Sequence, residues 1–217
     1  MSIVTYNNRS ITNISAIPGA AKSLTHIKTL TASSSSTLSF VDGSSDVVLD
    51  STYPIYLFKF INIHPSASQG EFQVGFRDGG SDYDATKTAS FFYAYADEAD
   101  TTADATVSYN TGKDIAQGTG FQIIADDMSN DNDGCGCGTL HLFNPSSTTF
   151  VKHFISRTTS MHGQPASFST FVAGYCNTTT AIDGVQFKFS SGTIDAVQFK
   201  FSSGNIDSGT IKLYGVT

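Results

Sequence analysis

The sequence lacks tryptophan and is poor in charge, proline and cysteine. Charged residues make up only 14% of the chain, against roughly 25% in typical soluble domains. The 12 Lys and Arg are outnumbered by 19 Asp and Glu, which gives a net charge of -7. Because nucleic-acid phosphates are bound by clustered Lys and Arg, we predict no nucleic-acid partner.

Long apolar runs are missing as well. No stretch approaches the roughly 18 consecutive apolar residues of a membrane-spanning helix, and the start, MSIVTYNNRSI, shows no basic segment followed by an apolar one. We therefore predict no membrane segment and no export signal, so that the chain is made in the cytosol. The Asn-X-Ser/Thr sequences at Asn8, Asn13 and Asn177 carry no weight as glycosylation sites there.

The cysteines are few and unevenly placed. Cys135, Cys137 and Cys176 form an odd set, and a reducing cytosol disfavours disulfides. Structural zinc sites space their paired cysteines by roughly two to four residues, whereas only Gly136 separates Cys135 from Cys137 and no second pair follows. We predict free thiols without a bound metal. The glycines beside Cys135 and Cys137 favour a tight loop that passes close to another backbone.

Catalytic signatures are also absent. The chain has no Gly-x-Ser-x-Gly elbow, P-loop, dinucleotide fingerprint or His-Glu-x-x-His pair. We therefore predict no catalytic residue, no cofactor and no enzymatic activity. His141 and His153 lie on neighbouring expected strands and could meet across a pair. We nevertheless interpret all the histidines as ordinary strand positions: His26, His64, His141, His153 and His162.

An acidic tract at residues 126–134 invites a calcium interpretation. When Gly134 is aligned with the loop glycine of an EF-hand, Ser129 takes the first ligand position and Leu140 the last, where a bidentate glutamate is required. The EF-hand pattern therefore fails. We interpret the tract as a solvated turn, and a calcium site of another type stays open as the alternative.

What the sequence does hold is hydroxyls, aromatic residues and strand patterns. Ser and Thr account for 55 of the 217 residues, beside 17 Phe and 9 Tyr. Aromatic and β-branched runs separated by Gly, Ser and Asn turns are typical of strands. We expect strands at residues 37–41, 55–63, 72–76, 91–95, 121–124, 140–143, 150–157 and 168–176, an acidic loop at 95–107 and an N-terminal arm at 1–23. The pattern predicts an all-β fold, an antiparallel β-sandwich of jelly-roll type over residues 24–217.

The strand expected at residues 55–63, IYLFKFINI, is apolar on both faces. Such a strand is central and covered twice. We expect a second sheet on one face and a loop or a neighbouring subunit on the other. With alternating side chains the two faces are Ile55, Leu57, Ile61 and Ile63 on one, and Tyr56, Phe58 and Phe60 on the other.

A tandem repeat lies near the C-terminus, at residues 185–207. The segment VQFKFSSGTID at 185–195 recurs at 197–207 with Thr193 replaced by Asn205. The repeat period of 12 is even, so each repeated side chain keeps its side of a sheet. We predict that residues 185–189 and 197–201 form antiparallel neighbours, because one preserved strand pattern is the simplest way to place the insertion.

Three stretches, at residues 50–65, 138–154 and 182–216, resemble virion structural proteins of tailed phages, especially marine and cyanobacterial ones. The resemblance spans most of residues 24–217, and the doubled VQFKFSSG segment departs from it. It implies a non-catalytic virion protein made in the host cytoplasm, either a capsid decoration or head-fibre protein or a tail or fibre component. Its expected partners are other virion proteins.

A self-association is expected too. The doubly apolar strand and the low charge favour a closed oligomer with an interface of aromatic and hydroxyl side chains, and the resemblance favours a homotrimer. The alternative function is a carbohydrate-binding module of a receptor-recognition fibre, and a glycan depolymerase comes third, because the acids lie in loops without the paired carboxylates it needs. Without tryptophan, sugar platforms would fall to tyrosines: Tyr53, Tyr83, Tyr93, Tyr95 and Tyr109.

Overall fold

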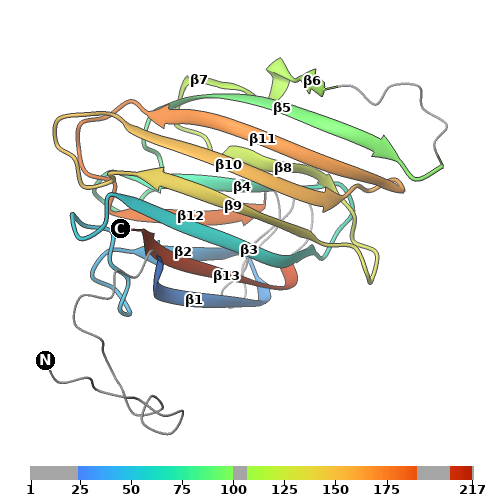
Figure 1. Ribbon diagram of the computed structural model, residues 1–217, viewed down its shortest axis with the longest axis horizontal. Helices are drawn as coiled ribbons and strands as arrows, with labels where there is room; N and C mark the ends of the chain where they lie inside the picture. Colours follow the sequence, from blue (N-terminus) through green and yellow to red (C-terminus); the bar gives the residue numbers. More distant parts are fainter. Residues whose placement is uncertain (1–23, 100–106, 190–205, 217) are drawn as a thin grey trace, which may run out of the picture.

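Two antiparallel sheets pack face to face in the computed structural model, which describes residues 24–99, 107–189 and 206–216 (Figure 1). The larger sheet runs β1 (Leu24–Ser35), β13 (Ile206–Val216), β3 (Ile55–Pro65), β9 (Gly136–Phe143), β10 (Lys152–Met161), β11 (Ala166–Cys176), β5 (Lys87–Asp97) and β6 (Val107–Tyr109), with β7 (Ile115–Gly118) also paired to β5. The smaller sheet runs β2 (Thr37–Val41), β12 (Gly184–Phe189), β4 (Gly70–Arg77) and β8 (Gln122–Met128). A short 3-10 turn, η2 (Thr111–Lys113), precedes β7.

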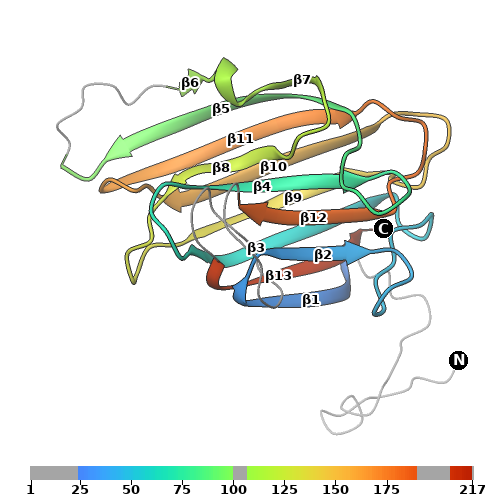
Figure 2. The ribbon, with the colours of Figure 1, turned by 180° about the vertical axis from the view of Figure 1, so that it is seen from behind.

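The all-β sandwich predicted from the sequence is confirmed. Seen from behind, the smaller sheet covers part of the larger one (Figure 2). The jelly-roll subtype is not confirmed, because the sheets hold nine and four strands where a jelly roll has about eight in all. Among the described residues, no helix is both long and apolar enough to cross a membrane.

An aromatic cluster fills the space between the sheets. In β12, Val185, Phe187 and Phe189 are buried while Gln186 and Lys188 are partly exposed, the alternation that a strand with one covered face requires. Phe187 lies at the centre of the cluster. Its ring centroid is 5.3 Å from Phe58 and 5.1 Å from Phe60 on the opposite sheet.

Most expected strands are confirmed with small shifts at their ends. The strand expected from residue 150 begins instead at Lys152, and Phe150 is 69% exposed before it. The acidic loop was wrong at its start, because β5 continues to Asp97 and Tyr95 packs edge-on against Phe168; residues 100–106 lie outside the described part. The solvated turn expected at 126–134 likewise begins with strand residues, up to Met128 in β8.

The strand β3 departs from simple alternation. Asn62 adopts a positive φ of 52°, and the register with β9 shifts between Phe60 and Ile63. This bulge turns Ile63, 1% exposed, into the core on the side of Phe60. The expected second apolar face is therefore smaller than predicted, with Leu57 only 7% exposed and Ile61 38% exposed. No further cover is needed over Ile63.

The first copy of the repeat is the central strand β12. Its residues pair with β2 on one edge and with β4 on the other. The predicted pairing of 185–189 with 197–201 therefore finds no free edge on β12, because β2 and β4 already supply its hydrogen bonds. The second copy's residues 197–205 and the arm at 1–23 lie outside the described residues.

Candidate binding face

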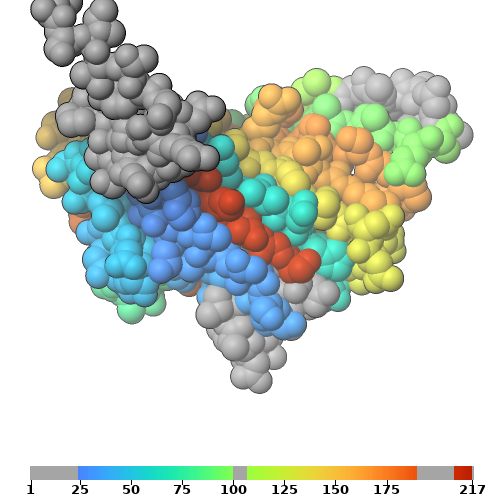
Figure 3. Space-filling view, turned by 60° about the horizontal axis from the view of Figure 1, so that its bottom comes forward, coloured from blue at the N-terminus to red at the C-terminus, as the bar shows by residue number. Residues whose placement is uncertain are grey.

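The side of the larger sheet turned away from the smaller sheet, here called the outer face, is not covered by any other described strand. Figure 1 shows it in front, and Figure 3 shows β1 in blue, β13 in red, β3 in cyan, β9 in yellow and β10 and β11 in orange as successive stripes. Alternation places every second side chain of these strands on it. In β10, for example, His153, Ile155, Arg157 and Thr159 are exposed while the residues between them are buried.

A row of side chains crosses the outer face from β6 to β13, the strand next to the edge strand β1. We call it the central row; its members are paired in register through six successive strand pairs. In spatial order they are Tyr109, Phe92, Phe171, Arg157, Thr139, Lys59 and Lys212. The row is aromatic at the β6 end and cationic at the β13 end.

The aromatic half of the row is a stack. The rings of Phe92 and Phe171 lie 5.1 Å apart and 6° from parallel, and the Arg157 guanidinium carbon lies 5.1 Å from the centroid of Phe171. Tyr109, 61% exposed, donates its hydroxyl hydrogen to the Asp114 carboxylate, and Phe92 is 36% exposed. These contacts order the side chains without covering them.

The cationic half of the row is not neutralised. Lys59 and Lys212 occupy directly opposed positions on β3 and β13, where like charges destabilise a sheet. Lys59 Nζ lies 5.0 Å from the ring centroid of Tyr214. Within the described residues, the ion pairs involve other cations, namely Arg77, Lys113 and His162.

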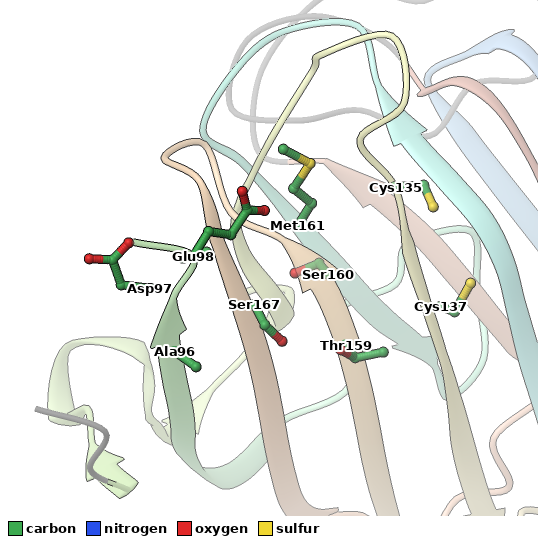
Figure 4. Close-up of a pocket in the computed structure, with 10 residues that line it drawn as sticks. Ala96, Asp97, Glu98, Cys135, Cys137, Thr159, Ser160, Met161 and Ser167 are labelled. Carbon is green, nitrogen blue, oxygen red and sulfur yellow. The ribbon is translucent and has the colours of Figure 1, made fainter. Parts of the chain in front are cut away.

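Two shallow hollows flank the central row. The first, of about 570 Å³, is lined by side chains at one end of β9, β10, β11 and β5, among them Cys137, Thr159, Ser167 and Glu98 (Figure 4). The second, of about 620 Å³, lies toward the other end and is lined by Phe143, His153, Phe154, Ile155, Ala173, Gly174 and Tyr175. Both are open to solvent, so they suit a ligand lying along the surface better than one enclosed in a cleft.

The five described strands at the centre of the outer face present no outward acidic side chain. No aspartate or glutamate occupies an outward position on β3, β9, β10, β11 or β5. Among the described acids, Asp97 and Glu98 at the end of β5 line the first hollow, and Asp114 accepts the Tyr109 hydrogen bond.

The cysteines differ in environment. Cys135 and Cys137 line the first hollow and are partly exposed, and all three thiols are free. The loop expected around them is wrong for Cys137, which lies inside β9. The close backbone approach is confirmed at Gly138, where a Cβ would lie 2.5 Å from the Arg157 carbonyl oxygen. Cys176 is buried beside Lys87 and Lys152, and burial raises the pKa of its thiol to about 12.

Thiol reactivity is expected to divide accordingly. In the native protein, Ellman's reagent should titrate the partly exposed Cys135 and Cys137 and leave Cys176 unmodified, because a fully buried thiol of raised pKa offers almost no thiolate. Burial also raises the pKa of Cys135, so this thiol should react more slowly than a free one. In denaturant all three should react. A Cys176→Ser variant is the control, and its native form should show the same number of reactive thiols as the native wild type. Fewer than three reactive thiols in the denatured wild type would instead reveal a disulfide or a bound metal.

The other residues singled out in the sequence are not gathered into a site. His141 lies opposite Ile155, stacks on Phe143 and has its pKa lowered by burial, while His153 packs against Tyr175. Their strands are paired, as expected, but the register does not set the two rings opposite each other. In the acidic tract, Ser129 and Asp131 hydrogen-bond to each other in a turn. In the described part of the chain no three His, Cys, Asp or Glu side chains gather at metal-binding distance.

Sequence reasoning missed a cluster of charges on the smaller sheet. Lys113 donates to the carboxylates of Glu71 and Asp126, the latter at 2.9 Å, and Asp126 is only 5% exposed. The expectation that acids lie in loops without partners is therefore wrong for this pair. No signal in the sequence links residues 71, 113 and 126, because three separate segments bring them together. The Lys113 ammonium is paired with both carboxylates, and its single positive charge leaves a net charge of -1 on the three groups.

Known proteins offer no guide to this site, because no family model, no curated protein and no solved structure matches the chain.

Proposed function

We propose that the protein is a non-catalytic structural component of a tailed-phage particle, on the capsid or in the tail, and that it binds its target through the outer face. The observation that carries the proposal is the outer face itself, a broad sheet surface with an ordered row of exposed side chains and two open hollows. A flat, pre-formed surface of this kind suits attachment. The phage assignment draws on the sequence resemblance.

The chemistry of the described residues supports a binding role over catalysis. Glu71 and Asp126 share an ion pair with Lys113, and the histidines pack against aromatic rings or turns. A glycosidase would need two carboxyl groups facing an open cleft. The homotrimer stays a prediction, and its sequence argument is weakened because the bulge at Asn62 turns Ile63 inward.

The carbohydrate-binding alternative is favoured by one observation. Of the five tyrosines considered as sugar platforms, Tyr109 is exposed and stands beside Phe92 in the central row. Tyr53 packs against Tyr56, and Tyr93 and Tyr95 pack against Phe168. An exposed aromatic edge of this kind is compatible with a virion protein that also adheres to a glycan.

A quantitative mass-spectrometric inventory of purified particles tests the proposed function. We expect peptides of this chain at a fixed ratio to the major capsid protein, because a structural component is incorporated stoichiometrically. Hundreds of copies would assign it to the capsid, and tens or fewer to the tail. Its absence from particles, with the protein present in infected cells, would overturn the assignment.

A further inference from the structure

We propose that the outer face binds an acidic polysaccharide bearing carboxylate groups, laid along the central row. The proposal rests on the outer face being the binding surface, as proposed above, and adds the chemistry of its ligand. Charge complementarity points to an anion. The chain as a whole carries -7, yet the central row presents Arg157, Lys59 and Lys212 with no carboxylate partner among the described residues.

The cations are placed so that an anion would relieve an unfavourable contact. Lys59 and Lys212 face each other across β3 and β13, and a carboxylate between them would replace repulsion by two charge-assisted hydrogen bonds. Arg157 is held by its stacking on Phe171. A guanidinium fixed over a ring still presents its N–H groups at the edge, where a planar carboxylate accepts two of them.

The other side chains of the outer face suit a polyhydroxylated ligand. Hydroxyl groups occupy six outward positions, one in the row (Thr139) and five beside it, and each can donate and accept a hydrogen bond: Thr88, Ser90, Thr139, Thr159, Ser167 and Ser169. Protein interfaces are enriched in aromatic residues and Arg but depleted in Ser, Ala and Lys, and the outer face carries both kinds of side chain. Its hydroxyl and Lys positions are the part of this composition that favours a sugar chain over a protein partner.

The geometry of the row suits an extended chain. Phe92 on β5 and Lys212 on β13 are five strand spacings apart, which amounts to about 24 Å at the usual separation of strands. The two open hollows run beside the row and give room for rings or substituents. A single-stranded nucleic acid would also be linear and anionic, but it would need more clustered cations than a chain of net charge -7 presents here.

Titration calorimetry of the full chain with a defined oligogalacturonate tests the proposal. We expect saturable binding that weakens with added salt, because exposed charges are screened. The matched ligand is the same oligosaccharide with its carboxyl groups reduced to alcohols, for which binding should be lost. A sulfated dextran and a thymidine oligonucleotide complete the set, and both are expected to bind much less.

Matched variants locate the site. Arg157→Gln, and separately the double variant Lys59→Gln with Lys212→Gln, should each weaken binding about tenfold, as loss of a charge-assisted hydrogen bond does. Lys188→Gln removes the same charge from the smaller sheet, where Lys188 covers the Phe121 ring, and should leave affinity within about twofold. Circular dichroism melts check that every variant remains folded.

Equal binding of the charged and reduced oligosaccharides, preference for the sulfated polymer or the oligonucleotide, or equal effects of Lys188→Gln and the central-row variants would overturn the proposal. Failure to bind any polysaccharide would overturn it too. None of these outcomes bears on whether the protein is found in purified particles by mass spectrometry. The proposed structural function is therefore tested independently of the ligand.

Discussion

Replacing Phe187 by alanine is expected to lower the free energy of unfolding by about 4 kcal/mol, near the upper end for a buried aromatic residue. Phe187 is fully buried, and its ring lies within 6.3 Å of the rings of Phe40, Phe58, Phe60 and Phe72. These neighbours come from both sheets, so removing the ring leaves a cavity where the sandwich is held together. Urea denaturation followed by far-ultraviolet circular dichroism gives the measurement.

Phe150→Ala is the matched control. It deletes the same side chain at a position that is 69% exposed, so its cost should stay within about 0.5 kcal/mol. Equal losses in the two variants would contradict the assignment of Phe187 to the centre of the core. The tandem repeat adds a second test. If Phe187→Ala alone costs little but a double variant with Phe199→Ala costs much, the second copy can take the place of β12.

The strands that sequence patterns predicted best are those with a regular alternation of buried and exposed side chains, or with buried side chains throughout. Residues 37–41 and 168–176 alternate between core and solvent, and both are strands in the structure. The run at 55–63 was also predicted as a central strand, and it lies between β13 and β9. In each case the burial of alternate apolar side chains is a local signal that the sequence carries directly.

The errors arose where a distant contact decides the conformation. Nothing in IYLFKFINI indicates that Asn62 will adopt a positive φ, yet this one residue moves Ile63 into the core. Asn62 sits against β9, where its backbone N–H donates to Cys137 Sγ at 3.4 Å. Parity alone cannot predict a bulge, because the extra residue changes which side chains face inward.

The central row was invisible for a similar reason. Its members come from seven different strands, and only the register of the larger sheet lines them up. The sequence showed Arg157 and Lys59 as scattered cations, which was correct along the chain and misleading in space. Long-range strand order, set by the packing of the whole sandwich, is the information that was missing.

Buried lysines show the same limit of sequence patterns. Lys87 is fully buried and donates to the backbone carbonyls of Thr119 and Gly120, and Lys152 is buried and donates to that of Thr178. Burial lowers the pKa of both ammonium groups. Strand patterns place lysine at the surface, so these two positions required the loops that cover them to be known.

The cluster formed by Lys113, Glu71 and Asp126 gives the second large effect. Lys113→Met is expected to cost about 3 kcal/mol at neutral pH, because removing one partner of a buried ion pair leaves an uncompensated charge. Asp126 is only 5% exposed, and in the variant it would face Glu71 without the ammonium group that separates them. The measurement is the free energy of unfolding in urea, with the wild type in parallel.

The pH dependence of that loss follows from the pKa of Asp126. Burial already raises this pKa above its ordinary 3.8, against the lowering effect of Lys113. Without Lys113 the pKa of Asp126 rises further. Asp126 is then protonated in the native state at a pH where the same carboxyl group of the unfolded chain has lost its proton. Stability of Lys113→Met should therefore fall as pH rises above that ordinary value and recover on acidification, which narrows the gap to the wild type.

Asp126→Asn in the Lys113→Met background separates charge from packing. The amide keeps the size of the side chain and removes the charge, so it should restore part of the lost stability at neutral pH and abolish the acid recovery. Asp126→Asn alone should destabilise the wild type, because Lys113 then loses one of its two carboxylates. A double variant no more stable than Lys113→Met would mean that the methionine fails by packing, and that the three charges do not act as a unit.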